Sequence, residues 1–372
     1  MRCGCLPRAS RCLPRCGHAS GKRMTSKHPE GIAVSMTSLP VQEVETKPSP
    51  EDEPKRAASF RDYVRIARPD HWTKHVFIIP GMILAYAIAV VSWDNLFRNI
   101  VLGFVSAASI SSANYVINEW LDRDFDRHHP SKTMRVAVKK GLSPWWVYAE
   151  YVVLLAVGLG IAWSLSALFF YTTVAFAISG LIYNVRPIRS KDRVYIDVLT
   201  ESLNNPIRLL LGWAMVDPAT LPPSSILVAY WMGGAFLMGT KRLSEYRQIV
   251  RTAGVAVLHR YRSSFRFYSE ERLLVSSFLY ALLSSFCIAV FLVKYRSEYI
   301  LALPLIAVMF TVYLSLSLET DSVAQRPEKL FRERILMGVT GSAVIALLLL
   351  SFIDLPDLDW ISEPRLFGVS SQ

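Results

Sequence analysis

The chain has 372 residues, of which 52% are hydrophobic and only 19% are charged, a composition too apolar for an ordinary soluble enzyme of this size. The 41 basic side chains outnumber the 30 acidic ones, but a diffuse basic excess is a poor argument for nucleic-acid binding, and we expect none. Four of the five cysteines crowd into the first 16 residues, which excludes a disulfide scaffold. The composition therefore indicates a membrane protein.

The N-terminal segment differs from the rest of the chain. Residues 1–58 are rich in Pro, Ser, Lys, Arg and Glu and show no apolar helical period, so they cannot bury enough surface to fold alone. They also lack the apolar core of a signal peptide. We expect a disordered, dispensable polar tail, then a membrane domain over residues 59–355 and a short tail over residues 356–372.

Long uncharged stretches separated by charged loops fill the remaining chain, and about 20 apolar residues are needed to cross a bilayer. An uncharged run over residues 151–185 predicts two helices joined near residues 164–166. A more polar segment, residues 194–216, predicts another. Single helices are expected at residues 75–92, 99–118, 221–240, 273–293, 299–318 and 335–353. The fold class predicted is all-α, with nine transmembrane helices.

The distribution of Lys and Arg supports nine crossings. If the N-terminus is cytoplasmic, the loops on that side carry 22 of these cations and the opposite side carries four. Omitting the polar helix at residues 194–216 would invert every later loop and destroy this asymmetry. We therefore expect a multi-pass protein with a cytoplasmic N-terminus.

Four polar residues recur at every fourth position near the cytoplasmic end of the second predicted helix: Asn114, Asn118, Asp122 and Asp126. Four residues advance a helix by about 400°, so these side chains form one stripe. Carboxylate and amide oxygens at a membrane boundary suit Mg²⁺, which typically bridges one or two carboxylates to substrate phosphates. The alternative is a solvated helix end paired with neighbouring arginines.

Cations follow this stripe and suit the oxygens of a diphosphate beside the metal. A basic cytoplasmic loop is, however, what the topology alone predicts. The candidates are Arg127, His129, Lys132, Arg135, Lys139 and Lys140.

A second polar stripe lies in the segment 194–216, where Asp197, Glu201, Asn204 or Asn205, and Arg208 share one helix face. Ionisable groups at membrane depth cost several kcal/mol unless they pair or face a polar cavity, so they predict a functional site. The alternative is an Arg–carboxylate cluster that only locks helices together.

A third cluster contains Lys241, Arg242 and Glu245 at the cytoplasmic end of the sixth predicted helix. The pair Lys241 and Glu245 alone would be an ordinary surface salt bridge. Its position on the same membrane side as Asp122 suggests two related halves around one central cavity.

The segment Asn118-Glu-Trp-Leu-Asp122-Arg-Asp-Phe-Asp126 resembles the first Asp-rich motif of the UbiA superfamily of intramembrane prenyltransferases. The resemblance covers about residues 60–353 and includes Arg68-Pro69-x-x-Trp72-x-Lys74 and Tyr183-Asn184-Val185. It implies a UbiA-like bundle in which Asn118, Asp122 and Asp126 are catalytic and hold Mg²⁺ with a diphosphate.

Within the superfamily, three motifs look most like decaprenyl-phosphate phosphoribosyltransferases: His129-Pro130-x-Lys132, Lys241-Arg242-x-x-Glu245 and Pro327-Glu328. Asp70-His71 and the segment 201–213 depart from that branch. The resemblance implies phosphate contacts at Lys74, Lys132, Arg135, Lys241 and Arg242. Further candidate substrate-binding residues are Tyr183, Asp197, Glu201, Arg208 and Glu245.

The resemblance implies a Mg²⁺-dependent transfer of 5-phosphoribose from phosphoribosyl diphosphate to a polyprenyl phosphate. The lipid would enter from the bilayer, and the diphosphate-bearing donor would come from the cytoplasm. One alternative is a conventional prenyltransferase that moves a prenyl group from prenyl diphosphate to an aromatic or other acceptor. Another is a transporter with an ion or substrate path along Asp197, Glu201 and Arg208.

Overall fold

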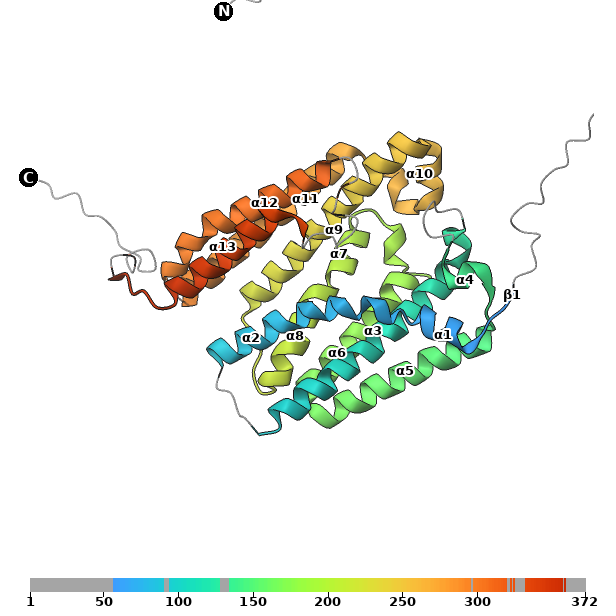
Figure 1. Cartoon of the computed structure of the whole chain (residues 1–372), viewed down its shortest axis with the longest axis horizontal. Coiled ribbons are helices and arrows are strands. Elements are labelled where there is room, and N and C mark those ends of the chain that lie inside the picture. Colours follow the sequence, from blue (N-terminus) through green and yellow to red (C-terminus); the bar gives the residue numbers. More distant parts are fainter. Residues whose placement is uncertain are drawn as a thin grey trace, which may run out of the picture. The chain divides into compact units, whose positions relative to one another are not determined.

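The structure is a computed structural model that describes residues 56–89, 94–127, 134–295, 297–319, 322, 324, 332–356 and 358 (Figure 1). Most of the predicted N-terminal tail lies outside the described residues. The same holds for His129, Lys132 and the pair Pro327-Glu328, and for nearly all of the predicted C-terminal tail.

Helices make up most of the described chain. The first group comprises α1 (Phe60–Ile66), η1 (Pro69–Ile78), α2 (Ile79–Ile88), α3 (Leu96–Asp126), α4 (Val136–Lys139), α5 (Pro144–Leu165) and α6 (Ala167–Asn184). Next come η2 (Ser190–Asp192), α7 (Ile196–Ser202), α8 (Asn204–Val216), α9 (Ser224–Ala253), α10 (Val255–Tyr261) and η3 (Ser263–Arg266). The last are α11 (Glu270–Tyr295), η4 (Ser297–Ala302), α12 (Leu303–Leu318) and α13 (Arg334–Leu350).

A short parallel strand pair departs from the all-α expectation. Strand β1 (Arg56–Ala57) pairs with β2 (Lys140–Gly141), with Arg56 opposite Lys140. Residues 56–57 belong to the expected tail, so a strand lies within its last residues. The pair joins the start of the membrane domain to the loop after α3.

Helices occupy all nine predicted ranges, although several bounds differ. Helix α3 continues to Asp126 and α9 to Ala253, well past the expected ends at residues 118 and 240, so the polar stripes lie on helix. Among the described residues, five helical segments are long and apolar enough to cross a membrane: 96–126, 144–165, 167–184, 270–295 and 297–318. That nine segments cross it stays a prediction.

The predicted polar helix over residues 194–216 is broken at Leu203 into α7 and α8. Pro206 explains the break, because its ring nitrogen cannot donate the backbone hydrogen bond that a continuous helix would place on Ser202. Asp197 and Glu201 therefore lie on α7, and Arg208 lies on α8. The two halves of the predicted stripe can face different surroundings.

Close contacts between helices fix the region around α8. A Cβ added at Gly81 of α2 would meet the carbonyl oxygen of Leu209, and one added at Gly212 would meet that of Ile78. Only glycine permits these backbones to approach so closely. Helix α8 also packs its buried Leu211 and Met215 into one apolar cluster with residues of α3 and α6.

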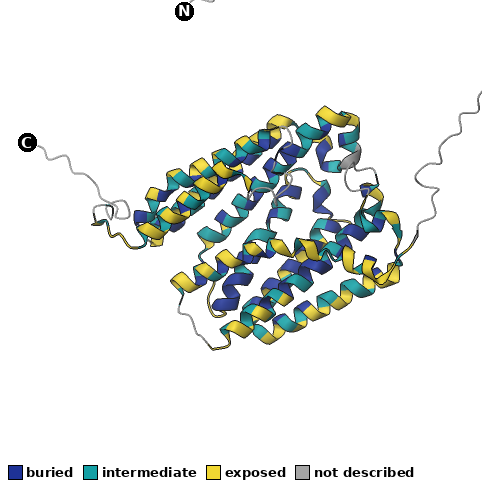
Figure 2. Cartoon of the chain, viewed as in Figure 1, coloured by how far each residue is buried: buried dark blue, intermediate teal, exposed yellow. Residues whose placement is uncertain are grey.

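The outer helices expose large apolar side chains, as the yellow residues of Figure 2 show. Examples are Trp163 of α5, Phe286 of α11 and Leu348 of α13, with 74%, 66% and 58% of their surface exposed. Apolar exposure on this scale is typical of a membrane-embedded surface or a large interface. Some charged side chains, such as those of Asp126, Asp197 and Arg242, are buried instead.

Candidate active site

The predicted metal stripe of α3 contacts a loop that lies far away in sequence. Asp122 Oδ1 accepts hydrogen bonds from Lys191 Nζ at 2.6 Å and from Arg189 Nη2 at 2.9 Å. Both cations belong to the loop around η2, between α6 and α7. Sequence analysis counted this loop only as evidence of topology, so it missed these two site residues.

The ammonium of Lys191 lies among three oxygen atoms. Besides Asp122, it donates to Asn184 Oδ1 at 2.8 Å and to Asn118 Oδ1 at 3.5 Å. Burial lowers the pKa of Lys191 to about 8, while the Asp122 carboxylate acts in the opposite direction. A carboxylate and two amide oxygens around one cation are a donor set that fits Mg²⁺, with phosphate oxygens as further ligands.

Asp126 is held separately from this oxygen cluster. Its Oδ2 accepts a 2.5 Å hydrogen bond from Arg135 Nη1, and the carboxylate is nearly buried. Asp122 and Asp126 nevertheless line one small pocket of about 50 Å³ with Arg189 and Lys191. Within the described ranges, no three His, Cys, Asp or Glu side chains gather as a metal-binding group.

A larger cavity of about 250 Å³ lies between α3, α6, α8 and α9. Six of the predicted site residues line it: Lys74, Asn118, Tyr183, Glu201, Arg208 and Lys241. Its apolar lining includes Phe77, Phe176, Leu237 and Met238. The cavity thus combines cations with a surface suited to a hydrocarbon chain.

The charges of this cavity are unbalanced. Among the described residues of its lining, three are basic (Lys74, Arg208 and Lys241) and Glu201 alone is acidic. Glu201 Oε2 already accepts from Arg242 Nη2 at 2.6 Å and from the Tyr183 hydroxyl at 2.7 Å. The remaining positive charge favours an anionic ligand.

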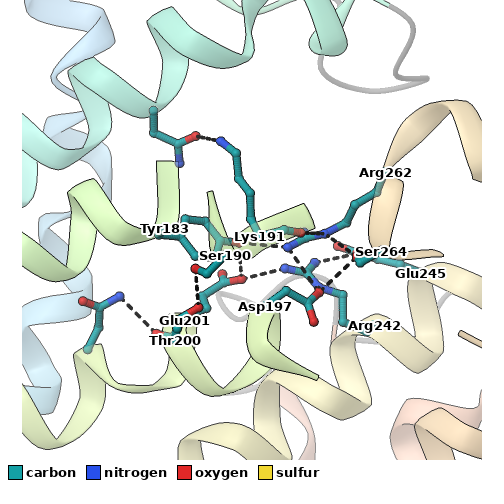
Figure 3. Close-up of polar contacts among 12 residues, drawn as sticks. Tyr183, Ser190, Lys191, Asp197, Thr200, Glu201, Arg242, Glu245, Arg262 and Ser264 are labelled. Atoms are coloured by element: carbon teal, nitrogen blue, oxygen red, sulfur yellow. Dashed lines mark hydrogen bonds and ion pairs between the residues drawn. The ribbon is translucent and has the colours of Figure 1, made fainter. Parts of the chain in front are cut away.

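Asp197 lies outside the cavity lining, in a buried network that Figure 3 shows. Its carboxylate has no exposed surface and accepts hydrogen bonds from the Tyr268 hydroxyl at 2.7 Å and Ser264 Oγ at 3.2 Å. The guanidinium groups of Arg262 and Arg242 approach it to 3.3 and 3.8 Å. The network resembles the Arg–carboxylate cluster that the sequence left open as an alternative, but its arginines are Arg242 and Arg262, and Arg208 is not part of it.

Arg242 and Glu245 also belong to this network. Arg242 is 4% exposed, and its Nη1 donates to Glu245 Oε2 at 2.7 Å (Figure 3). Because Arg242 Nη2 also donates to Glu201, both ends of the guanidinium bind protein carboxylates. Its predicted contact with phosphate stays a prediction, and the geometry favours a positioning role instead.

The network and the cavity meet at Tyr183. Its hydroxyl donates to Glu201 and accepts from Arg262 Nη2 at 3.0 Å, while Arg262 Nε donates to the Lys191 carbonyl at 3.3 Å. Arg262 thereby connects the network to the loop that holds Asp122. Neither Arg262 nor Tyr268 was a sequence candidate, because their loop carried no periodic signal.

A bundle of apolar helices around a polar, cation-rich cavity is typical of a multi-pass membrane protein. The chain belongs to the UbiA prenyltransferase family, whose model matches residues 77–350.

Two curated relatives show how the chain compares in sequence. Nodulation protein NoeC of Azorhizobium caulinodans is 30% identical over 194 residues, which are 52% of this chain and 60% of that protein. Decaprenyl-phosphate phosphoribosyltransferase of Mycobacterium tuberculosis is 26% identical over 208 residues, which are 54% of this chain and 66% of that enzyme. The chain therefore matches less than two thirds of the length of either relative.

Solved structures share the fold. A UbiA homologue from Archaeoglobus fulgidus bound to GPP and Mg²⁺ superposes with a TM-score of 0.58 at 20% identity, over 78% of this chain and 100% of that chain. The same homologue bound to DMAPP and Mg²⁺ also gives a TM-score of 0.58, at 22% identity and the same coverage. At such low identity, these likenesses concern the fold alone.

Proposed function

We propose that the protein is a Mg²⁺-dependent intramembrane transferase that moves 5-phosphoribose from phosphoribosyl diphosphate to a polyprenyl phosphate. The family supports transfer to or from a polyprenyl lipid. The relative from Mycobacterium tuberculosis, which bears the name of a decaprenyl-phosphate phosphoribosyltransferase, supports the finer assignment.

The observation that carries the proposal is the positive charge in the cavity. Lys74, Arg208 and Lys241 line it, while its one described carboxylate, Glu201, is already paired. Two phosphate-bearing substrates would bring several negative charges into this space. A neutral acceptor would leave more of the positive charge uncompensated.

The residues around Asp122 have distinct roles in the proposed reaction. Asn118, Asp122 and Asn184 would hold Mg²⁺, with Asp126 one turn further along α3. When bound, the metal supplies charge neutralisation for the diphosphate leaving group. Arg189 and Lys191 would donate hydrogen bonds to the diphosphate oxygens.

The bond that breaks joins the anomeric carbon of ribose to the diphosphate, which leaves with the electron pair. The bond that forms joins that carbon to an oxygen of the lipid phosphate. Buried cations stabilise the charge that develops on the leaving group more than water would, because they are already oriented. The buried network of Asp197, Arg242 and Arg262 would keep the surrounding helices and the η2 loop in place.

The substrates would reach the cavity from different sides. The loop with Arg189 and Lys191 belongs to the basic side of the topology, so the donor would enter from the cytoplasm. Apolar side chains such as Phe176 and Leu237 suit a lipid tail that enters from the bilayer.

Transfer of a prenyl group from prenyl diphosphate is the second candidate, because the same apolar lining would hold an allylic chain. A transfer assay on the detergent-solubilised protein separates the two. One tube contains Mg²⁺, radiolabelled phosphoribosyl diphosphate and polyprenyl phosphate, and the other contains Mg²⁺, prenyl diphosphate and aromatic acids. Label that enters the lipid phase in the first tube alone, and is lost with EDTA, supports phosphoribosyl transfer. Product in the second tube alone contradicts it.

A further inference from the structure

Arg208 of α8 is a buried cation without an anionic partner. Its residue surface is 7% exposed, and its Nε is buried without a hydrogen bond. Within the part of the chain that the structure describes, Arg208 makes no hydrogen bond or ion pair. Its guanidinium carbon lies 5.2 Å from the centre of the Phe176 ring, a cation–π contact.

Such a charge is costly unless something compensates it. A guanidinium at membrane depth pairs with an anion or faces a polar cavity, and a ring face offsets only a small part of its lost hydration. Among the described residues, the other buried arginines are paired: Arg242 bonds both Glu201 and Glu245, and Arg189 bonds Asp122. Arg208 instead lines the large cavity, where an anionic ligand would supply the missing partner.

The position of Arg208 separates it from the predicted metal end. Tyr183 and Glu201 line the cavity near the η2 loop. Phe176 lies seven residues before Tyr183 on α6, and Arg208 on α8 lies seven residues after Glu201 on α7. Seven residues correspond to about two helical turns, or about 10 Å. Arg208 therefore marks a second, deeper level of the cavity.

The backbone around Arg208 is fixed. Gly212 lies one turn further along α8, and a Cβ there would meet the Ile78 carbonyl oxygen. This contact with Ile78 at the end of η1 leaves α8 little freedom to rotate Arg208 away from the cavity. The guanidinium is thus preorganised for binding a ligand.

We infer that Arg208 binds a phosphate monoester, the headgroup of the polyprenyl phosphate acceptor. The inference rests on the proposed function and extends it to a specific acceptor-binding residue. A guanidinium offers a planar fork of donors that matches phosphate oxygens. Phe77, Phe176 and Met238 line the same cavity and suit the adjoining isoprenoid chain. The 5-phosphate of the donor has the same chemistry and is the competing source.

Binding measurements without turnover test the inference. The variants Arg208→Gln and Arg208→Lys are purified as full chains in detergent and titrated with geranylgeranyl phosphate, geranylgeraniol or phosphoribosyl diphosphate. Arg208→Gln should bind geranylgeranyl phosphate about 10- to 100-fold more weakly, the loss of a charge-assisted contact. Binding of the uncharged alcohol should not change, and Arg208→Lys should recover part of the affinity.

The ligand that loses affinity identifies the source of the phosphate. Loss confined to geranylgeranyl phosphate supports the acceptor assignment. Loss confined to phosphoribosyl diphosphate overturns that assignment and places the donor there. Unchanged binding of both phosphorylated ligands overturns the anion site itself. Arg98→Gln is the matched control, because Arg98 lies on α3 and does not line the cavity.

Thermal unfolding of the ligand-free protein distinguishes a ligand-binding role of Arg208 from a structural one. Removal of an uncompensated charge should leave the melting temperature of Arg208→Gln equal or higher. A clear decrease would mean that Arg208 stabilises the fold, and would overturn the inference. If Arg208→Gln cannot be purified, the affinities of Arg208→Lys and of the wild-type chain for geranylgeranyl phosphate and for geranylgeraniol can still be compared.

Failure of the proposed function would look different. Without phosphoribosyl transfer in the labelled assay, the reaction is wrong, whatever Arg208 binds. If the wild-type chain transfers phosphoribose but Arg208→Gln binds geranylgeranyl phosphate normally, the proposed reaction is supported and the proposed role of Arg208 is wrong.

Discussion

The Lys191 ammonium lies 2.6 Å from Asp122 Oδ1, although the two residues are 69 positions apart in the chain. The same ammonium contacts the side-chain oxygens of Asn184 and Asn118. A protein cation therefore contacts the side-chain oxygens of Asn118 and Asp122, two of the three residues to which the sequence assigns a metal ion.

Replacement of Lys191 by Met should increase the affinity of the ligand-free protein for a divalent cation. An ammonium and a metal ion cannot both contact the same oxygens, and removal of a neighbouring positive charge should tighten binding about tenfold or more. Titration with Mn²⁺, followed by electron paramagnetic resonance, measures the change. Arg193→Met is the control, because Arg193 is an exposed cation of the same loop. Equal Mn²⁺ affinity in both variants would refute shared occupancy.

Asp122→Asn should lower the turnover of phosphoribosyl transfer by about 10²- to 10³-fold, as expected when one preorganised electrostatic contact is removed. The substituted amide keeps the shape of the side chain and removes its charge. Asp124→Asn makes the same change two residues further along α3, where 63% of the side chain is exposed. Radiolabel transfer by the two variants, at equal amounts of folded protein, gives the comparison. Normal turnover in Asp122→Asn would exclude the proposed site.

Asp197→Asn should affect stability more than catalysis. Loss of the carboxylate leaves Arg242 and Arg262 with fewer anionic partners, and breaking a buried ion pair costs about 3–5 kcal/mol. Glu270→Gln is the matched control, because it breaks an exposed pair with Arg247 that is worth at most about 1 kcal/mol. Thermal unfolding in detergent should show a much larger decrease for Asp197→Asn. An unchanged melting temperature would contradict the structural role.

Gly212→Ala should destabilise the fold, because the added methyl group meets the Ile78 carbonyl oxygen and neither backbone can move freely. Overpacking of this kind costs about 1–3 kcal/mol. Gly160→Ala is the same change on α5, where a Cβ meets no atom within 4 Å. It should raise helix stability by about 0.5–1 kcal/mol. Melting temperatures that move in the same direction would show that α2 and α8 are less tightly packed.

Cysteine accessibility tests the orientation in the membrane. In a chain whose five cysteines are replaced by serine, single cysteines at Arg193 and Arg98 should label from opposite sides. The positive-inside rule predicts that Arg193→Cys reacts with an impermeant maleimide from the cytoplasmic face. Labelling of Arg98→Cys from that face would invert the topology.

The sequence by itself determined the features that depend on local order. Apolar stretches indicated the helices, because backbone hydrogen bonds in a bilayer have to be satisfied within each segment. The four-residue spacing of Asn118, Asp122 and Asp126 placed them on one face of α3, because helical periodicity is fixed by the backbone.

Only the tertiary structure decided which charges meet. Arg189 and Lys191 reach Asp122 through a loop that returns from α6, and no local pattern in the sequence records that approach. Packing likewise divides one predicted stripe: Asp197 is held in a buried ion network, whereas Glu201 and Arg208 line the cavity. Periodicity assigns residues to a face of a helix. How the helices pack decides what that face contacts. Packing therefore decides whether a charged residue is structural or binds a ligand.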